Sequence, residues 1–272
     1  MQLNTINNQP YSFSEYWKKL GRYGFLIPVL ARRELKIKYS RTLIGVGWFF
    51  IQPLAVVIVY SIFFKYLIHI QSDNIPYSSF VFSGLVLWYL FTNLIGKSTF
   101  ALIESSELIN KVAFPRIIII IAKIVPVLLE NLVLLILLLF VTAINGQALG
   151  FNIFTAMFYF TEVFILGLAL GILCSIIALR HRDIAHTIPI AINFGIWLTP
   201  VFFPLSIVPE TFRNFLLYLN PLASSIEGLR GAIFKSSGIS MISLIIFTFS
   251  LLLLAGSFFY FIKFEKKIVE NL

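Results

Sequence analysis

Long runs of apolar residues, broken only by short polar or basic segments, form the hydrophobic pattern of this chain. An α-helix rises about 1.5 Å per residue, so about 20 consecutive apolar residues cross the roughly 30 Å hydrocarbon core of a bilayer. The pattern predicts six transmembrane helices, over residues 43–67, 78–100, 117–144, 153–179, 188–204 and 241–262. We therefore expect an all-α integral membrane protein, with residues 1–42 as a cytoplasmic N-terminal segment and residues 43–272 as the six-helix transmembrane domain.

The composition agrees with this fold class and excludes several others. Of the 272 residues, 59% are apolar and 12% are charged, and the mean hydropathy is +0.92, which is outside the range of ordinary soluble domains. The net charge is +9, but the basic residues lie between the apolar runs and not in one patch, so we expect no nucleic acid partner. The single cysteine, Cys174, excludes an intrachain disulfide.

The distribution of Lys and Arg predicts the orientation of the chain in a membrane. These residues concentrate before the first apolar run, between the second and third, between the fourth and fifth, and after the last. Few of them lie in the other connections. Because positive residues are retained on the cytoplasmic side, we expect both termini to be cytoplasmic.

Residues 28–39 predict a helix that begins at Pro28 and precedes the first apolar run. Ala31, Leu35 and Tyr39 recur at helical spacing, and this row is flanked by three basic residues, Arg32, Arg33 and Lys36. An apolar row beside basic side chains is typical of an amphipathic helix in the cytoplasmic interface of a membrane, in contact with lipids. The alternative is a solvated basic collar that only sets the topology.

Two connections predict further short helices. Residues 104–113 are polar, and Pro115 disfavours helix at Phe114. This segment predicts a short cytoplasmic helix, which is either a plain connector or a docking element for a soluble partner.

After the fifth run, two short helical patterns are separated by Asn220-Pro221. Their apolar positions are Phe212, Phe215, Leu216 and Leu219 in the first pattern, and Leu222, Ile226, Leu229 and Ile233 in the second. They predict a re-entrant helical hairpin over about residues 205–238, with an ordinary extracellular loop as the alternative.

The sequence carries no catalytic or nucleotide-binding motif. Gly96-Lys97-Ser98 resembles the end of a phosphate loop, but Phe91 stands where the first glycine is required. The three histidines are scattered and lack the spacing that chelates a metal ion. We expect no enzymatic activity, no catalytic residue, no metal and no cofactor in this chain, so any work that it performs must be driven by a partner.

Polar and aromatic residues inside the apolar runs are the candidate functional groups. Glu130 and Glu162 lie within the third and fourth runs, where each must face another helix or an aqueous path; a structural interhelical hydrogen bond is the alternative to a functional role. Gly167 and Gly171 predict close helix packing. Most of the aromatic residues are expected to lie at the membrane–water interfaces or to face lipid.

Four of them could instead line a conduit, where sugar rings would stack on their faces. The four are Trp48, Tyr60, Trp88 and Trp197.

Five motifs occur in order: Glu34-Leu-Lys-Ile-Lys-Tyr-Ser-Arg-Thr-Leu-Ile-Gly45, Ala113-Phe-Pro-Arg116, Arg180-His-Arg-Asp-Ile184, Leu198-Thr-Pro-Val-Phe-Phe-Pro204 and Asn220-Pro-Leu-Ala-Ser-Ser-Ile226. As an ordered set, they resemble the transmembrane subunit of ABC-2 type polysaccharide exporters. This family moves lipid-linked O-antigen, capsule or teichoic acid across the bacterial cytoplasmic membrane. The likeness extends from about Ile27 to the C-terminus.

The resemblance implies a homodimer in the bacterial inner membrane, with two copies of a separate ATPase subunit that binds ATP and Mg. The cargo would be a lipid-linked polysaccharide, most directly O-antigen for lipopolysaccharide biosynthesis. The ATPase would dock on Arg32, Arg33, Lys36, Glu107, Asn110 and Lys111. A cytoplasmic gate near the lipid-linked headgroup would consist of Tyr39, Ser40, Arg41 and Gly45, and the hairpin would shape the outer exit.

Three other functions are compatible with parts of the pattern. An ABC-2 permease for teichoic acid, capsule, a drug or a lipid would share the same architecture. An ion-coupled secondary carrier would use Glu130 and Glu162, but the six runs contain no evident inverted repeat. A membrane-bound transferase for lipid-linked sugars would need clustered catalytic side chains at one interface, and the sequence contains no such cluster.

Overall fold

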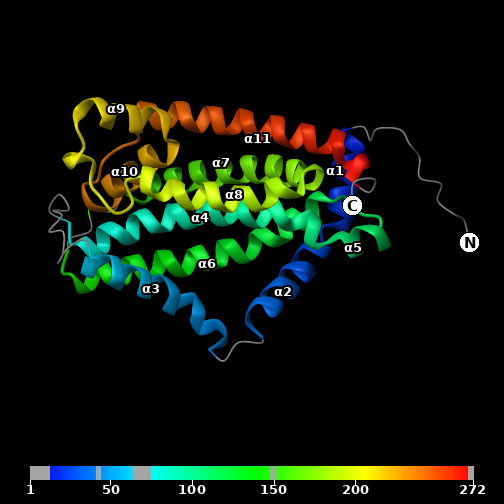
Figure 1. Cartoon of the computed structure of the whole chain (residues 1–272), viewed down its shortest axis with the longest axis horizontal. Coiled ribbons are helices and arrows are strands. Elements are labelled where there is room, and N and C mark those ends of the chain that lie inside the picture. The colour runs from blue at the N-terminus through cyan, green and yellow to red at the C-terminus, as the bar shows by residue number, and fades with distance from the viewer. Residues whose placement is uncertain (1–12, 41–43, 64–74, 148–149, 151, 269–272) are drawn as a thin grey trace, which may run out of the picture.

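The computed structural model describes residues 13–40, 44–63, 75–147, 150 and 152–268, and every regular element in this part of the chain is helical (Figure 1). The α-helices are α1 (Phe13–Tyr23), α2 (Leu26–Tyr39), α3 (Trp48–Tyr60), α4 (Tyr77–Glu104), α5 (Ser106–Lys111), α6 (Ile117–Ile144), α7 (Ile153–Arg180), α8 (Arg182–Gly195), α9 (Glu210–Leu219), α10 (Pro221–Phe234) and α11 (Met241–Ile268). Short 3-10 turns lie at Gly45–Gly47, Ile196–Leu198 and Leu205–Ile207. The all-α fold class is confirmed.

Four of the six predicted runs form helices that are long and apolar enough to cross a membrane, namely α4, α6, α7 and α11. The first and fifth runs form shorter helices. α3, with the turn that follows it, is an apolar helix from Trp48 to Phe63. α8 begins at Arg182, well before the predicted start at residue 188, because the polar segment in front of the apolar run is already helical. It ends at Gly195, and turns replace the predicted helix up to residue 204.

α4 lies at the centre of the bundle and contacts α3, α6, α7, α8 and α10. Its most apolar window is 72% buried, against 17% for that of α11, which packs mainly on α7. Gly167 and Gly171 of α7 face α4: a Cβ atom would come within 2.9 Å of Leu94 at the first position and 2.8 Å of Ser98 at the second. The glycine pair therefore permits the close packing that the sequence predicted.

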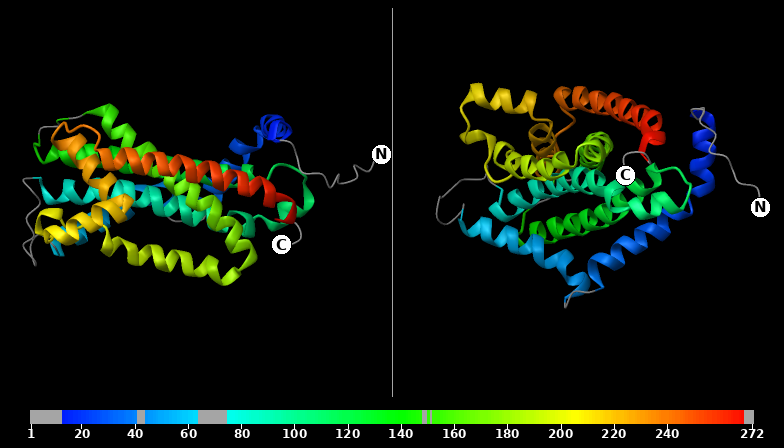
Figure 2. Two further views of the ribbon diagram at one scale, coloured as in Figure 1. Left: turned by 90° about the horizontal axis from the view of Figure 1, so that it is seen from above. Right: turned by 45° about the vertical axis from the view of Figure 1, so that its right-hand side comes forward.

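The two ends of the bundle carry different elements (Figures 1 and 2). α1, α5, the start of α2 and the end of α11 gather at one end, and α9 and α10 lie at the other. The hydrophobic pattern did not predict α1, because this helix is mostly polar and too short for a membrane span. Its buried Tyr16 packs edge-on against Phe258 of α11, with 6.1 Å between the ring centroids. Trp17 of α1 also lies against Phe258, with 5.5 Å between the ring centroids, so tertiary contacts hold a short helix that hydropathy does not detect.

α9 and α10 are the two short helices that the sequence predicted. The Asn220 side chain accepts hydrogen bonds from the backbone N–H groups of Leu222 and Ala223, at 3.0 and 3.3 Å, and Pro221 opens α10. All four predicted apolar positions of α10 are buried, whereas three of the four on α9 are strongly exposed, namely Phe212, Phe215 and Leu219. The helices are confirmed, and their re-entry into the membrane stays a prediction.

Candidate functional site

Two charged contacts attach α2 to α6. The Lys123 ammonium group of α6, only 5% exposed, bonds to the carboxylate of Glu34 on α2 at 3.2 Å and also to that of Glu104 at the end of α4. We call these three residues the Lys123 cluster. Lys38 at the end of α2 donates to Oε1 of Glu130 on α6 at 2.5 Å. The two contacts lie about 10 Å apart along α6, so α2 follows α6 from one end of the bundle to near the midpoint of that helix.

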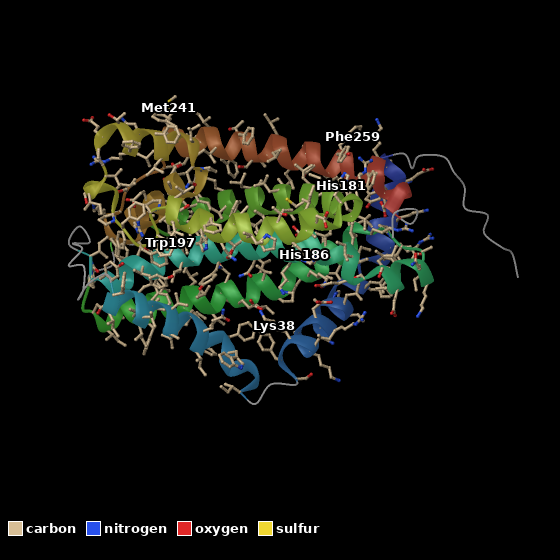
Figure 3. The ribbon with its side chains drawn as sticks, in the orientation of Figure 1. Lys38, His181, His186, Trp197, Met241 and Phe259 are labelled. Carbon is tan, nitrogen blue, oxygen red and sulfur yellow. The ribbon has the colours of Figure 1, made fainter. Side chains whose placement is uncertain are left out.

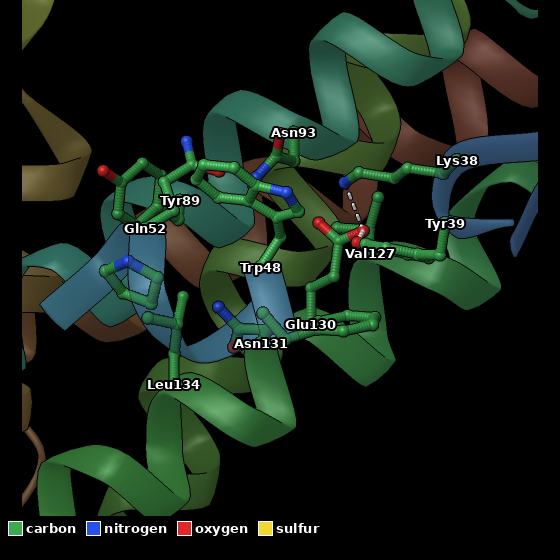
Figure 4. A pocket seen from close by; sticks show the side chains of 12 residues that line it. Lys38, Tyr39, Trp48, Gln52, Tyr89, Asn93, Val127, Glu130, Asn131 and Leu134 are labelled. Atoms are coloured by element: carbon green, nitrogen blue, oxygen red, sulfur yellow. Dashed lines mark hydrogen bonds and ion pairs between the residues drawn. The ribbon is translucent and has the colours of Figure 1, made fainter. Parts of the chain in front are cut away.

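A cavity of about 160 Å³ lies where α2 and α3 meet at an angle against α4 and α6 (Figures 1 and 4). We call it the elbow cavity. Its lining combines polar side chains with aromatic ones: Lys38, Tyr39, Gln52, Asn93, Glu130 and Asn131 among the former, and Trp48, Phe49 and Tyr89 among the latter. A cavity that is partly aromatic and holds a few convergent polar groups is typical of a small-molecule binding site.

Tyr39 connects the ion pair with the aromatic wall of the elbow cavity. Its hydroxyl donates to Oε1 of Glu130 at 2.9 Å, and its ring stacks on Phe49 with 4.4 Å between centroids. Burial, followed by the hydrogen bond to Glu130 and the charge of that carboxylate, raises the pKa of Tyr39 above its ordinary value. The hydroxyl therefore remains a hydrogen-bond donor across the physiological pH range. Glu130 thus faces another helix, as expected for a carboxylate within an apolar run.

The residues predicted to dock an ATPase lie on two helices at the same end of the bundle. Three of them are exposed on α2, namely Arg32, Arg33 and Lys36, and three are exposed on α5, namely Glu107, Asn110 and Lys111. A small cleft lined by Leu30 and Arg33 of α2 and by Leu108 of α5 joins the two helices. The structure therefore brings both sets into one surface, which we call the end surface.

The residues predicted to form a gate begin with Tyr39, the last residue of α2, and continue into the connection to α3. Tyr39 lines the elbow cavity, and Ser40 is exposed at the C-terminus of the helix. Gly45 has a φ of +55°, in the left-handed region that favours glycine, and it opens the turn before α3. Arg41 lies outside the described residues. The described gate residues therefore sit at the junction between α2 and α3.

The four aromatic residues predicted to line a conduit do not form one row. Trp48 borders the elbow cavity. Tyr60 stacks on Phe202 with 3.9 Å between ring centroids, and the exposed Trp197 lies 5.9 Å from the same ring, near the end of the bundle that carries α9 and α10 (Figure 3). Trp88 is buried in the core on α4. Only Trp48 of the four lines the elbow cavity.

Glu162 occupies a different environment from Glu130. It is fully buried on α7, and neither of its carboxyl oxygens has a hydrogen-bond partner among the described residues. Ser225 of α10 lies beside it, but the Ser225 hydroxyl donates to the Pro221 carbonyl oxygen at 2.9 Å. The two carboxylates are therefore not parts of one site.

Arg230 of α10 is a structural residue that the sequence analysis did not single out. Its buried guanidinium group donates to the carbonyl oxygens of Phe80, Pro200 and Val201 at 2.8–3.2 Å, and to Glu227 at 2.6 Å. It also lies over the Phe80 ring, 3.5 Å from the centroid. The sequence feature that could have identified Arg230 is its position next to Leu229, a charged residue beside the predicted apolar face of a helix. Arg230 thereby joins α10 to α4 and to the segment after α8.

Histidines and carboxylates do not gather at a metal-binding position in the described part of the chain. His181 precedes α8, and His186 lies within it, with its ring 6.0 Å from that of Phe100 (Figure 3). The end surface and the elbow cavity are therefore the two features of the described structure to which a function can be attached.

Comparison with known proteins identifies the family. The family model described as ABC-2 type transporter matches residues 26–234, from the start of α2 to the end of α10. The chain belongs to this family. As a member with several long apolar helices, it is a multi-pass membrane protein.

Individual relatives in this family have printed names that refer to polysaccharides. The chain is 29% identical over 214 residues to the O-antigen export system permease protein RfbA of Myxococcus xanthus, covering 76% of this chain and 79% of the relative. It is 27% identical over 254 residues to a protein of the same name from Klebsiella pneumoniae, covering 87% and 91%. It is also 24% identical over 241 residues to the polysialic acid transport protein KpsM of Escherichia coli, covering 84% and 92%.

Proposed function

We propose that this chain is the permease subunit of an ATP-driven ABC transporter that exports lipid-linked polysaccharide, specifically O-antigen, across the bacterial inner membrane. In this proposal two copies of the chain assemble with two copies of a separate ATPase subunit, which binds ATP and Mg. Both termini are cytoplasmic, α2 lies at the cytoplasmic interface, and α9 and α10 shape the outer exit.

The observation that carries this proposal is the nearly full-length similarity to proteins named O-antigen export permeases. The matches cover most of both chains, and the family match over residues 26–234 includes the end surface and the elbow cavity. The relative named for polysialic acid transport supports export of a polysaccharide and leaves a capsule polymer as the alternative cargo.

The end surface and the elbow cavity agree with an exporter that is driven by a separate ATPase subunit. The end surface presents exposed charged groups from α2 and α5, which suits a soluble protein partner. The Lys123 cluster connects that surface to α4 and α6, and the elbow cavity lies farther along the same helix α2. Movement of a bound ATPase would therefore reach the cavity through α2.

Deletion and reconstitution test this proposal. Deleting the gene in its source organism should abolish surface O-antigen and leave lipid-linked polymer inside the cell, and a plasmid copy should restore it. In proteoliposomes, the chain together with its separate ATPase subunit should move lipid-linked O-antigen only with ATP and Mg. Normal surface O-antigen in the deletion strain would contradict the cargo, and transport by the chain alone would contradict the dependence on an ATPase.

A further inference from the structure

The elbow cavity has the size of one six-membered ring. Its volume is about 160 Å³, and an apolar protein cavity of about 150 Å³ binds one molecule of benzene. A pyranose ring is also six-membered but carries hydroxyl groups around its edge, so a matching site must combine flat apolar walls with hydrogen-bonding groups. The cavity therefore has room for a single sugar unit.

The walls of the cavity include flat aromatic surfaces. Trp48 is partly exposed and borders the cavity from α3, and Tyr89 borders it from α4 (Figure 4). Tyr39 and Phe49 stack on each other at 4.4 Å and form a further part of the lining. The C–H groups on one face of a sugar ring pack against the electron-rich face of an aromatic ring. These residues provide the apolar part of such a site.

Hydrogen-bonding groups complete the lining. Both bonds to the Glu130 carboxylate, from Lys38 at 2.5 Å and from Tyr39 at 2.9 Å, use Oε1, so Oε2 can accept from a ligand hydroxyl. Asn131 donates through Nδ2 to the Val86 carbonyl oxygen at 2.7 Å, which orients the amide while its own oxygen can accept. The side-chain amides of Gln52 and Asn93 add donors and acceptors.

The charge balance favours a neutral ligand. Among the described residues, the charged side chains that line the cavity are Lys38 and Glu130, and they neutralise each other through their direct contact. A phosphate group that accepts from Lys38 would lie beside the Glu130 carboxylate and be repelled by it, whereas a neutral hydroxyl can bond to both groups without this repulsion.

We infer that the elbow cavity is a subsite for one neutral pyranose unit of the cargo, held between aromatic faces and the amides of α3, α4 and α6. This inference rests on the proposed export of polysaccharide and narrows it, because it assigns recognition of a single sugar unit to a cavity within one subunit. The position of the cavity at the end of α2 places the bound sugar beside the helix that carries part of the end surface.

Binding of simple glycosides to the purified full-length chain in detergent tests the inference. Methyl pyranosides of common neutral hexoses are titrated by saturation-transfer NMR, and inorganic pyrophosphate is used as a competitor. We expect at least one methyl pyranoside to bind and pyrophosphate not to displace it. Failure of every glycoside to bind, or displacement by pyrophosphate, would overturn the subsite.

Variants locate the binding. Asn93→Leu and Gln52→Leu replace the amide with an apolar side chain of comparable size, and Trp48→Ala removes an aromatic face. Each should weaken glycoside binding at least fivefold, the effect of losing about 1 kcal/mol. Trp17→Ala on α1, remote from the cavity, is the matched control and should bind as the wild type does. Because Gln52 is exposed, Gln52→Leu remains informative if Asn93→Leu does not fold. Wild-type affinity in folded Asn93→Leu and Gln52→Leu would reject the site.

Export measurements separate this inference from the proposed function. If glycosides do not bind and the cell still exports O-antigen through this chain, the subsite alone fails. If glycosides bind in the elbow cavity and surface O-antigen is unaffected by deletion of the gene, the proposed function fails while the site stands.

Discussion

At the scale of single residues, buried charges show how this chain tolerates polar groups inside an apolar bundle. Arg230 is buried with its donors directed to backbone carbonyl groups, whereas Glu162 is buried without a hydrogen-bond partner among the described residues. A buried polar group stabilises a fold only when its hydrogen bonds are made. The two residues should therefore respond to substitution in opposite directions.

Replacing Arg230 with Met should destabilise the protein. The change leaves the carbonyl oxygens of Pro200 and Val201 without the donor that Arg230 supplies and removes the ion pair with Glu227, so the free energy of unfolding should fall by about 3 kcal/mol. Thermal unfolding in one detergent measures the effect. Lys235→Met, a change at an exposed position beyond α10, is the control and should shift stability by less than about 0.5 kcal/mol. An unchanged melting temperature for Arg230→Met would show that these bonds contribute nothing.

Replacing Glu162 with Leu should stabilise the fold by about 1 kcal/mol, because an unpaired carboxyl group is removed from the interior. Glu162→Gln should export polymer at the wild-type level, since an ATP-driven permease does not need an ionisable group on α7. Glu130→Gln is the matched control and should lower stability through loss of the Lys38 ion pair. Loss of export in Glu162→Gln, with normal folding, would instead favour ion-coupled transport.

At the scale of elements, α2 is the helix on which the proposed coupling depends. Its apolar row, Ala31, Leu35 and Tyr39, faces the bundle, while its basic residues are exposed. The predicted contact of this helix with lipids stays a prediction. The Lys123 cluster holds it to both α4 and α6. Glu104 of this cluster lies at the end of α4, and α5 follows α4 directly. The two parts of the end surface, on α2 and on α5, are therefore connected through the Lys123 cluster.

Replacing Lys123 with Met should loosen α2, because Glu34 and Glu104 would then face each other as like charges. We expect faster amide hydrogen exchange along α2 and a lower melting temperature. The triple variant Lys123→Met, Glu34→Gln, Glu104→Gln removes the repulsion and should restore slow exchange. Lys97→Met, at an exposed position on α4, is the control. Wild-type exchange of α2 in Lys123→Met would contradict the attachment.

Charge reversal on α5 should uncouple ATP hydrolysis from export. The exposed Glu107–Lys111 pair is 3.9 Å apart and stabilises α5 little, so Glu107→Lys or Lys111→Glu should leave the permease folded. Export per ATP hydrolysed should fall about tenfold, the effect of losing about 1.4 kcal/mol of docking energy. Lys18→Glu on α1 makes the same change elsewhere at this end and should couple normally. Normal coupling in both α5 variants would remove the docking role.

At the scale of the whole molecule, the surface divides into a polar end and long apolar sides. Met241 and Phe259 mark the outer face of α11, which is exposed along most of its length (Figure 3). The exposed apolar residues of α9 continue this surface at the opposite end of the bundle. Lipid or a second copy of the chain must cover these faces in the membrane.

Cysteine labelling tests whether α9 enters the membrane. In a Cys174→Ala background, a cysteine at Phe215 should react much more slowly with a membrane-impermeant thiol reagent than one at Asn214. Both positions are exposed in the single chain, so any difference must come from lipid or from another subunit. Labelling in detergent, where both should react, is the control. Faster reaction at Phe215 in membranes would reject the predicted orientation.

The sequence by itself determined most of the helical segments, with α1 and the end of α8 as the exceptions, and which faces of several helices are apolar. Unbroken apolar runs produced α4, α6, α7 and α11, because a helix is the structure that satisfies its own backbone in an apolar medium. Asn220-Pro221 separated α9 from α10 through local capping. Gly167 and Gly171 marked a close helix contact, since the spacing alone places them on one face.

Only the tertiary structure decided which helices meet. Periodicity states which side of a helix is apolar but not which neighbour covers that side. It therefore predicted an apolar face on both α9 and α10, but the face of α9 is exposed and the face of α10 is buried. The partners of Glu130 and Arg230 lie about 90 and up to 150 residues away in the chain. The elbow cavity exists because four helices converge, and that arrangement depends on packing between distant segments and not on any local pattern.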